Sequence, residues 1–484
     1  MKHSGSRFIW PALVALVASQ LSLAGSAAEQ PSETASQEPQ KVSYYRDVRP
    51  ILQQHCQGCH QPAMPSGGLV MTSYPDLLKA GDTQMPGIVP GDADQSAIVM
   101  QITSLGGEAP AMPKGKPPLS ETEVNVVTRW IVEGAIDDTP ETAREVIDME
   151  HPPVYELPPV LTSLAFSPDG ALLAVSGDHE VLLHKADGSE LVARLVGLSE
   201  RVESIAFSPD GKRLAVAAGS PYRFGELQVW DVAEKRLDFA LTVTFDSIYG
   251  VSWSRDGSMI AFGCADNTVR AVDSQTGKQV LFQGAHADWV LDTVFSTDAS
   301  HLVSVSRDRS MKLTEVATQR FVDNVTSITP GALKGGLQVV ARHPAKDELL
   351  IGGADGTPKI YQMYRTKARQ IGDDFNLIRQ FDSMPGRIFA ADYSPAGDWV
   401  VVGSSYNGVG EVRVYQEADA KLVSKFEGQH GGVYTLSVSP DGNAVASGGF
   451  DGVVRLNDPR TGRLIKEFFA APLKTTEAVA LQSP

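Results

Sequence analysis

One short sequence pattern occurs seven times between residues 160 and 442 of this 484-residue chain. Each copy is a β-rich run followed by a turn of the Ser-Pro-Asp-Gly kind, as in SLAFSPDG, which ends at Gly170. The other six copies end at Gly211, Gly257, Ala299, Lys346, Gly397 and Gly442, so the spacing is 41 to 51 residues. A period in the forties is typical of proteins built from one repeated supersecondary unit. The repeats therefore constrain the fold more than any other feature of the chain.

Each copy is followed by three more β-rich runs, such as LLAVSG and EVLLHK after the first. Four strands per unit at this period predict a β-propeller of the WD-repeat type. Seven units predict an all-β, seven-bladed propeller over residues 160–471, with a C-terminal tail at 472–484. Two closures of the ring are possible. The run from Leu464 to Ala470 completes the last blade alone, or the segment from Val154 to Val160 adds a strand.

The repeat region carries only parts of the WD signature. The dipeptide itself occurs once, as Trp230-Asp231. His286 and His430 each precede an innermost strand, and Asp308 and Asp451 lie at the following turns. We expect these histidines and aspartates to form hydrogen-bond relays within a blade, which makes them scaffold. We find no catalytic motif in this region.

The segment Cys56-Gln57-Gly58-Cys59-His60 has the CxxCH spacing that attaches haem c. The two thiols add to the two vinyl groups of the porphyrin, and the histidine then supplies the proximal nitrogen to the iron. The alternatives are half of a zinc site or a dithiol redox pair. The chain has no second CxxC or Cys/His cluster for zinc and no βαβ context for a thioredoxin-like pair. The motif therefore predicts one covalently bound haem c, with Cys56, Cys59 and His60 as its attachment and ligand residues.

Two helices are predicted around this motif. Tyr45, Val48, Ile51 and Leu52 fall at helical spacing just before it. Ser120 and Glu123 form a capping box that begins a second helix, which ends at Gly134. A helix before the motif and a closing helix are typical of small single-haem cytochromes. We therefore predict an all-α cytochrome c domain at residues 43–137, in front of the propeller.

The iron of such a haem has either a sixth ligand or an open site. No histidine occurs between His60 and His151, so methionines are the candidates for a sixth ligand within this domain. Met64 is too close to the motif to reach the opposite face of the ring. Met71 and Met100 sit in apolar contexts that suit core packing. Two methionines that precede proline in loops are left, Met85 and Met112. Met112 is favoured because it lies just ahead of the closing helix, with Met85 as the second choice.

Residues 44–135 resemble the planctomycete-type cytochrome c domain family. The matching pieces are DVRPILQQHCQGCH, GGLVM, IVPGDADQS, MPKGKPPLS and WIVEGA, in this order. The resemblance implies a covalent haem with His60 and, at the Met-Pro motif, Met112 as axial ligands. A thioether opposite histidine raises the reduction potential and closes the iron to substrates. Such a site transfers electrons and does not activate oxygen.

The N-terminus predicts export, which haem c attachment also requires. Lys2, His3 and Arg7 precede an apolar run from Phe8 to Ala24, and small residues allow cleavage after Ala28. We predict a signal peptide at 1–28, a flexible linker at 29–42 and a second linker at 138–159. The alternative is an uncleaved membrane anchor, but the run is short for a span and contains Pro11. The expected location is the bacterial periplasm, with no membrane span after cleavage.

Charge and cysteine content narrow the function further. The 58 acidic against 42 basic residues argue against nucleic acid as a partner. Cys264 is the third and last cysteine and lies in the apolar run IAFGCA, so we expect a buried thiol.

The leading hypothesis is an exported one-electron carrier whose propeller docks a redox partner protein on a propeller face or at the haem edge. This hypothesis favours an electron-transfer protein over an enzyme. Lys114 and Lys116 beside the proposed ligand either steer an acidic partner or lie in a solvated loop. One alternative is a propeller-based haem enzyme, by analogy with dissimilatory nitrite reductases, which hold a second haem in an eight-bladed propeller. Another is a haem-linked redox sensor.

Overall fold

The computed structural model describes residues 41–61, 64–104, 108–140, 147–284, 286–327, 334–370 and 372–474. From Val42 onward, these residues belong to one compact unit. The predicted signal peptide and almost all of the first linker lie outside the described residues, as does most of the predicted C-terminal tail. Within the described ranges, no helix combines the length and apolar character needed to cross a membrane.

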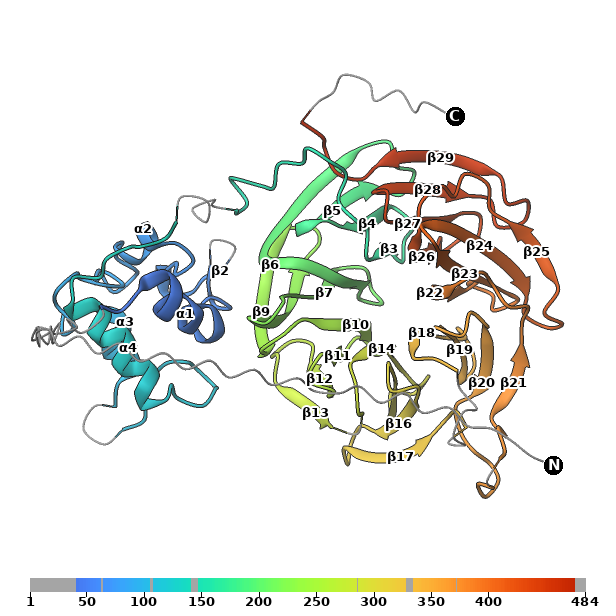
Figure 1. The fold of residues 1–484 in the computed structure, drawn as a ribbon, viewed down its shortest axis with the longest axis horizontal. Helices are drawn as coiled ribbons and strands as arrows, with labels where there is room; N and C mark the ends of the chain where they lie inside the picture. Colours follow the sequence, from blue (N-terminus) through green and yellow to red (C-terminus); the bar gives the residue numbers. More distant parts are fainter. Residues whose placement is uncertain are drawn as a thin grey trace, which may run out of the picture. The chain divides into compact units, whose positions relative to one another are not determined.

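The first part of the described chain is helical, in agreement with the predicted cytochrome domain (Figure 1). Its helices are the π-helix η1 (Tyr44–Val48), α1 (Arg49–His55), the short 3-10 helix η2 (Ser66–Gly68), α2 (Tyr74–Leu77), α3 (Ala97–Ile102) and α4 (Glu121–Val132). Two short strands, β1 (His60–Gln61) and β2 (Met64–Pro65), pair in antiparallel fashion. Loops connect these elements.

The two predicted helices are present, and local chemistry explains their ends. At α4 the Ser120 hydroxyl accepts from the backbone N–H of Glu123, whose carboxylate accepts from the N–H of Ser120 at 2.8 Å. The predicted capping box is therefore confirmed. Gly134 has φ of 100°, a conformation that L-residues rarely adopt, and it stops the helix two residues after Val132. The helix before the motif consists of η1 and α1, with Pro50 in the first turn of α1.

An aromatic cluster holds the helical part together. The rings of Tyr44 and Trp130 stack with centroids 5.2 Å apart, and Tyr74 meets both rings edge-on. Trp130 is 1% exposed and its indole N–H donates to the carbonyl of Ile136. Because Tyr44 begins η1 and Trp130 lies on α4, this cluster joins the helices that flank the CQGCH motif. His55 at the end of α1 also lies 3.1 Å from the carboxylate of Glu123 on α4.

The rest of the described chain is built from antiparallel strands, consistent with a β-propeller (Figure 1). Five sheets have four consecutive strands each. The first contains β10 (Ile248–Trp253), β11 (Met259–Cys264), β12 (Val269–Asp273) and β13 (Gln279–Gln283). The second contains β14 (Val290–Phe295), β15 (His301–Ser306), β16 (Met311–Glu315) and β17 (Arg320–Asn324). The third contains β18 (Leu337–Arg342), β19 (Glu348–Gly353), β20 (Lys359–Gln362) and β21 (Leu377–Gln380).

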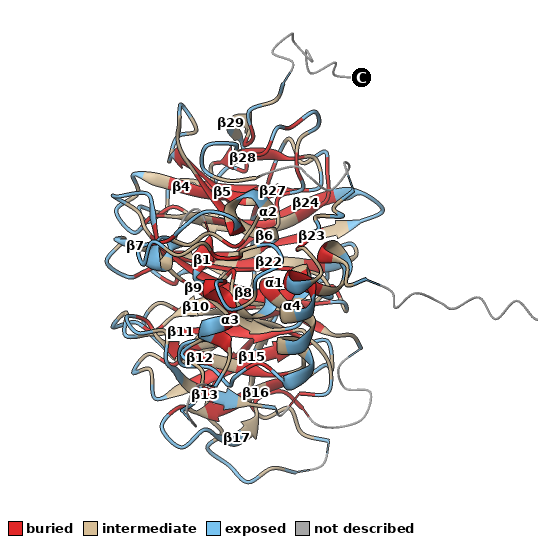
Figure 2. Cartoon of the chain, turned by 90° about the vertical axis from the view of Figure 1, so that its left-hand side faces the viewer, coloured by how far each residue is buried: buried red, intermediate tan, exposed pale blue. Residues whose placement is uncertain are grey.

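The fourth sheet contains β22 (Arg387–Tyr393), β23 (Trp399–Tyr406), β24 (Val409–Gln416) and β25 (Leu422–Lys425). The fifth contains β26 (Val433–Val438), β27 (Val445–Gly449), β28 (Val453–Asn457) and β29 (Leu464–Phe469). A sixth sheet has seven strands: β3 (Leu164–Phe166), β4 (Leu172–Ser176), β5 (Asp178–Lys185), β6 (Leu191–Phe207), β7 (Arg213–Ser220), β8 (Phe224–Asp231) and β9 (Arg236–Thr244). Buried residues follow the middle of the strands and exposed residues the turns (Figure 2).

The repeated Ser-Pro-Asp-Gly turns adopt one geometry, which explains the repeat. The serine hydroxyl donates to the aspartate two residues later, at 2.5 Å for Ser167 and Asp169 and at 2.6 Å for Ser208 and Asp210. The glycine of each turn has positive φ, for example 72° at Gly170. These turns join the first two strands of a unit, as predicted.

Contacts between the two ends of the strand region settle the open question of closure. The run from Leu464 forms β29, which pairs with β28 and so completes the last sheet alone. Among the described residues, the segment from Val154 to Val160 adds no strand to that sheet and makes one isolated bridge, between Tyr155 and Leu473. The first strand, β3, lies against β26, where the N–H of Leu164 donates to the Thr435 hydroxyl at 2.9 Å.

Candidate functional site

The CQGCH motif forms a tight turn directly after α1. The backbone N–H groups of Cys59 and His60 both donate to the carbonyl of Cys56 at 3.1 Å. His60 then enters the short strand β1, and its carbonyl accepts from the N–H of Met71 at 2.8 Å. The helix end and the β1 strand therefore place both cysteines and the histidine on one short loop.

Both cysteines of the motif are free thiols, as attachment to a porphyrin requires. Cys56 is half-buried against the apolar core of the helical part, and Cys59 is exposed. Burial raises the pKa of Cys56 to about 12, with a further contribution from neighbouring Cys59. Cys56 is thus a protonated thiol at neutral pH, unlike a low-pKa redox cysteine. Cys264 is fully buried, as predicted, and burial raises its pKa to about 12.

The His60 side chain is buried and is oriented by one ring nitrogen. Its Nδ1 lies 3.3 Å from the carbonyl oxygen of Leu69. This contact favours the tautomer with a proton on Nδ1, which leaves the Nε2 lone pair free to bind a metal. Burial lowers the pKa of His60, although backbone groups of Leu69 and Ser66 act in the opposite direction. The imidazole is therefore neutral at pH 7, the state that binds iron.

The methionines differ in their surroundings. Met112 is half-buried and packs against the same core cluster as Cys56, whereas Met85 is half-buried and does not belong to this cluster. Met71 is 5% exposed within the core, as predicted. The prediction for Met100 is wrong, because it is 40% exposed. Helix α3 turns Ile98, Val99 and Ile102 inward, which puts Met100 on the outer side.

The sequence did not indicate a role for two residues near the motif, Gln57 and Glu226. Gln57 is 5% exposed, and its amide donates to the carbonyl of Met71 at 2.8 Å, which ties the motif to the following loop. Glu226 on β8 is a fully buried carboxyl group. Burial raises its pKa, although Gln228, Ser199 and Gln61 donate hydrogen bonds to it and Lys116 lies near it. Nothing in a β-rich run distinguishes a buried glutamate from an exposed one, so no sequence signal was available.

The two lysines beside Met112 have different environments. The ammonium group of Lys116 donates to the carbonyl of Thr242 at 2.9 Å, and loss of solvent lowers its pKa. Lys114 is exposed, and no hydrogen bond or ion pair is found for it among the described residues. Lys116 therefore bonds to the chain itself, although the residue stays exposed. A steering role stays a hypothesis for both lysines.

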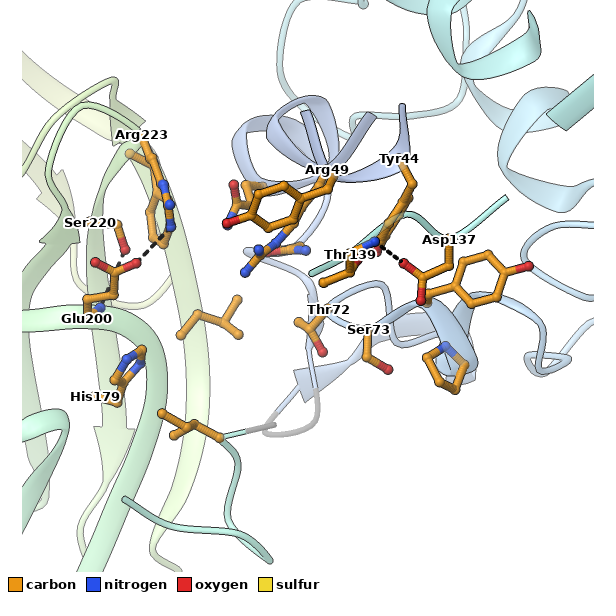
Figure 3. Close-up of a pocket in the computed structure, with 18 residues that line it drawn as sticks. Tyr44, Arg49, Thr72, Ser73, Asp137, Thr139, His179, Glu200, Ser220 and Arg223 are labelled. Atoms are coloured by element: carbon orange, nitrogen blue, oxygen red, sulfur yellow. Dashed lines mark hydrogen bonds and ion pairs between the residues drawn. The ribbon is translucent and has the colours of Figure 1, made fainter. Parts of the chain in front are cut away.

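A polar pocket of about 480 Å³ lies beside α1, on the side of Tyr44 and Arg49 (Figure 3). Its wall also includes Glu200 and Arg223, whose charged groups pair at 2.8 Å. Asp137 faces the pocket as well and accepts from the N–H of Thr139 at 2.9 Å. The charges on its wall are of both signs, so the pocket has no preference for ligands of one charge.

The residues of the CQGCH loop suit a haem c group by the chemistry of their donors. Two free thiols at the required spacing, a neutral buried imidazole with a free Nε2 and a thioether on the same apolar core supply attachment, one nitrogen ligand and one sulfur ligand. Within the described part of the chain, no group of three or more His, Cys, Asp or Glu residues is placed to hold a metal ion. The donor set fits a porphyrin iron better than a bare ion.

The prediction of a scaffold relay is confirmed at His286 and is wrong at His430. His286 Nδ1 lies 3.0 Å from Asp308 and its Nε2 lies 2.8 Å from the Ser304 hydroxyl, which links three parts of one sheet. His430, in contrast, is exposed. Its neighbour Gln429 takes the equivalent place and donates to the Ser447 hydroxyl at 3.1 Å, while Asp451 pairs with Arg455 at 2.7 Å. A shift of one residue in the loop before β26 explains the difference.

Three protein-family models match separate parts of the chain. The model described as "Planctomycete cytochrome C" matches residues 56–115, which include the CQGCH motif and Met112. The "WD domain, G-beta repeat" model matches residues 153–185 and 420–458. The "Anaphase-promoting complex subunit 4 WD40 domain" model matches residues 221–296. The chain therefore combines a cytochrome c-like domain with WD40 repeats.

Curated relatives are similar to only part of the chain. "Periodic tryptophan protein 2" of Saccharomyces cerevisiae is 24% identical over 277 residues, which is 50% of this chain and 29% of the relative. "Eukaryotic translation initiation factor 3 subunit I" of Candida glabrata is 24% identical over 213 residues, or 44% of this chain and 48% of the relative. The chain thus spans less than half the length of either relative. Neither name refers to haem or to export.

Proposed function

We propose that this protein is an exported c-type cytochrome that carries one covalently bound haem and transfers single electrons. The observation that carries the proposal is the donor set of the CQGCH loop: free thiols at Cys56 and Cys59 and a buried, neutral His60 oriented by Leu69. The match of the cytochrome family model to residues 56–115 supports it independently.

Each residue of the loop has a role in this proposal. Cys56 and Cys59 bind the group covalently, and His60 binds its iron through Nε2. Met112 supplies the sixth ligand, supported by its contact with the core that Cys56 also touches. Leu69 holds the imidazole ring through its carbonyl, and Gln57 fixes the loop to Met71. The bound group supplies reversible one-electron chemistry, and the methionine keeps substrates away from the iron.

The propeller, in this proposal, has seven blades and docks a redox partner. The seven-stranded sheet consists of two blades joined by the 17-residue strand β6. Residues Leu191–Val196 of β6 pair with β5 as the outer strand of one blade. Residues Arg201–Phe207 pair with β7 as the inner strand of the next blade. With the five four-stranded sheets, this division gives the seven units that the repeats predict.

The location stays a proposal as well. A c-type haem is attached outside the bacterial cytoplasm, and the basic and then apolar N-terminus has the pattern of a signal peptide. We therefore place the mature protein in the periplasm.

Redox titration of the purified holoprotein tests the function. Spectroelectrochemistry is expected to give one wave of a one-electron couple. The absorbance spectrum of the same sample is expected to show one haem per chain and no further chromophore. Nitrite is added to the reduced protein in the same experiment. A second cofactor band, or turnover of nitrite, would instead favour the propeller-based enzyme. A variant of the same chain with Cys56→Ala and Cys59→Ala, expressed in parallel, is expected to give no covalent haem and serves as the blank.

A further inference from the structure

The strand region encloses a cavity of about 1130 Å³ that is lined by residues of all its inner strands. The lining comes from β6, β10, β14, β18, β22 and β26, together with the residues around the start of β3. These strands surround the centre of the ring of sheets (Figure 1). The cavity belongs to the propeller alone, and the proposed electron transfer does not use it.

The inner strands share one irregularity, which lies near the start of their pairing with the neighbouring strand. In five of them, a single residue has no partner on the neighbouring strand. The unpaired residues are Glu203, Leu291, Gln338, Phe389 and Tyr434, and every one of them lines the cavity. In β10 the pairs Tyr249–Gly263 and Ser252–Ala261 flank a similar bulge. A β-bulge bends the strand and re-aims a side chain. The repeated bulge therefore directs one variable side chain into the cavity from each of these five strands.

Arginines lie beside pairs of aromatic rings in the lining of this cavity. Tyr249 and Trp289 stack with ring centroids 5.7 Å apart, and the guanidinium of Arg307 lies 4.5 Å from the centre of the Trp289 ring. On β22 and β26, Phe389 and Tyr434 meet at 5.0 Å, and Arg387 lies 5.8 Å from the Phe389 ring. Because the rings hold the guanidinium groups in place, less side-chain entropy is lost when these groups bind a ligand.

The charge of the cavity is opposite to that of the chain. The whole chain has a formal net charge of −16, yet Arg201, Arg307 and Arg387 are exposed at this cavity. Among the described residues, no carboxylate forms an ion pair with Arg201 or Arg387, whereas Arg307 pairs with the half-buried Asp288 at 3.5 Å. Burial raises the pKa of Glu203, Asp292 and Asp392, the acidic residues of the lining. Because the pKa of Asp292 is raised to about 7, this carboxyl group is only partly ionised at neutral pH and offsets less of the arginine charge.

We propose that this arginine and aromatic cavity binds an acidic, aromatic-containing peptide segment of a partner protein. Carboxylates match the three guanidinium groups, and aromatic or apolar side chains match the ring pairs. The cavity of about 1130 Å³ exceeds the usual range for a single small ligand and has room for an extended peptide segment. The acidic chain as a whole disfavours a nucleic acid. This assignment deepens the docking role of the propeller in the proposed function, and it makes no use of the haem.

Fluorescence anisotropy with the full-length holoprotein tests the proposal. The probe is a fluorescein-labelled twelve-residue peptide of alternating glutamate and tyrosine, compared with the matching glutamine–tyrosine and lysine–tyrosine peptides. We expect saturable binding of the acidic peptide that weakens as salt is raised, and much weaker binding of the other two. The triple variant Arg201→Gln, Arg307→Gln, Arg387→Gln is expected to bind at least about tenfold more weakly.

A matched control separates the cavity from general charge. Arg320→Gln, Arg460→Gln and Arg463→Gln remove three exposed arginines that do not line the cavity, and this variant is expected to bind like the wild type. Thermal melting checks that both triple variants are folded, and Phe389→Leu gives a second, uncharged change in the cavity. Equal binding by both triple variants would overturn the proposal, as would equal binding of the lysine–tyrosine peptide. Tighter, arginine-dependent binding of a labelled oligothymidylate would also overturn it. The haem spectrum is read on the same samples, so a failure of the haem assignment is seen separately.

Discussion

The helical part and the strand part of this chain are organised in opposite ways. In the helical part, the chemistry is concentrated in the five residues of CQGCH, and the surrounding elements are short helices and loops. In the strand part, no such motif occurs, and most units repeat a similar turn and a similar inner-strand bulge. The first part thus depends on a few irreplaceable residues, whereas the second distributes its structure and its proposed binding site over many blades. Variants of matched residues in the two parts make this difference measurable.

The largest effects are expected from the two fully buried tryptophans. Trp130 on α4 and Trp230 on β8 are each 1% exposed. Replacing either by alanine is expected to cost about 3–5 kcal/mol of unfolding free energy. Trp130→Ala is expected to lower the temperature of the unfolding transition seen by absorbance of the proposed haem, because Trp130 stacks on Tyr44 in the helical part that carries the CQGCH loop. Trp230→Ala is expected to lower the temperature of the unfolding transition seen by far-UV circular dichroism, while the haem spectrum stays unchanged. Equal loss of haem absorbance in both variants would contradict the separation of roles.

A comparison of Met112 with Met85 sharpens the account of the helical part. Met112→Ala is expected to abolish the ferric sulfur-to-iron charge-transfer band. The reduction potential then falls by on the order of 0.1 V, within the range of about 0.8 V that axial ligands span. Met85→Ala is the control, since Met85 lies outside the core cluster. If Met112→Ala keeps the band and Met85→Ala loses it, the ligand is Met85.

The two histidines of the strand part offer a smaller contrast. His286→Ala removes a buried group bonded to Asp308 and Ser304, and we expect a loss of about 1–3 kcal/mol in unfolding free energy. His430→Ala changes an exposed side chain and is expected to stay within about 0.5 kcal/mol of the wild type. Urea unfolding followed by circular dichroism measures both. A similar loss for the two variants would mean that the second relay forms in solution.

The smallest expected effect is a pH dependence at Asp308. Burial alone raises its pKa, but hydrogen bonds from His286 and Ser310 outweigh burial and hold the pKa well below its usual range. A carboxyl with a lowered folded pKa stabilises the fold above its unfolded pKa of about 3.9, and this stability is lost as the pH falls further. The difference in unfolding free energy between wild type and Asp308→Asn is therefore expected to be largest above about pH 5 and to shrink toward pH 3. A difference that grows on acidification would contradict this assignment.

Sequence reasoning worked where local chemistry determines local structure. Ser120 and Glu123 predicted the start of α4 because a capping box needs only residues three apart. It failed where position depends on a loop register, as at His430, where Gln429 occupies the expected place. It also missed the arginine and aromatic cavity, because Arg307 and Arg387 come from different repeats and line one cavity only once the sheets surround it. Met100 was misplaced because an apolar context does not indicate which face of a short helix is inside.

Covalent attachment of haem tests the central claim most directly. The full chain is expressed with its own N-terminus in a bacterial host that matures c-type cytochromes, and the denatured protein is analysed by intact mass and by the pyridine haemochrome spectrum. The account predicts one haem per chain that acid–acetone extraction does not remove, and none in the Cys56→Ala, Cys59→Ala variant. A wild-type chain that carries no covalent haem in that host, where a control cytochrome c is matured, would contradict it.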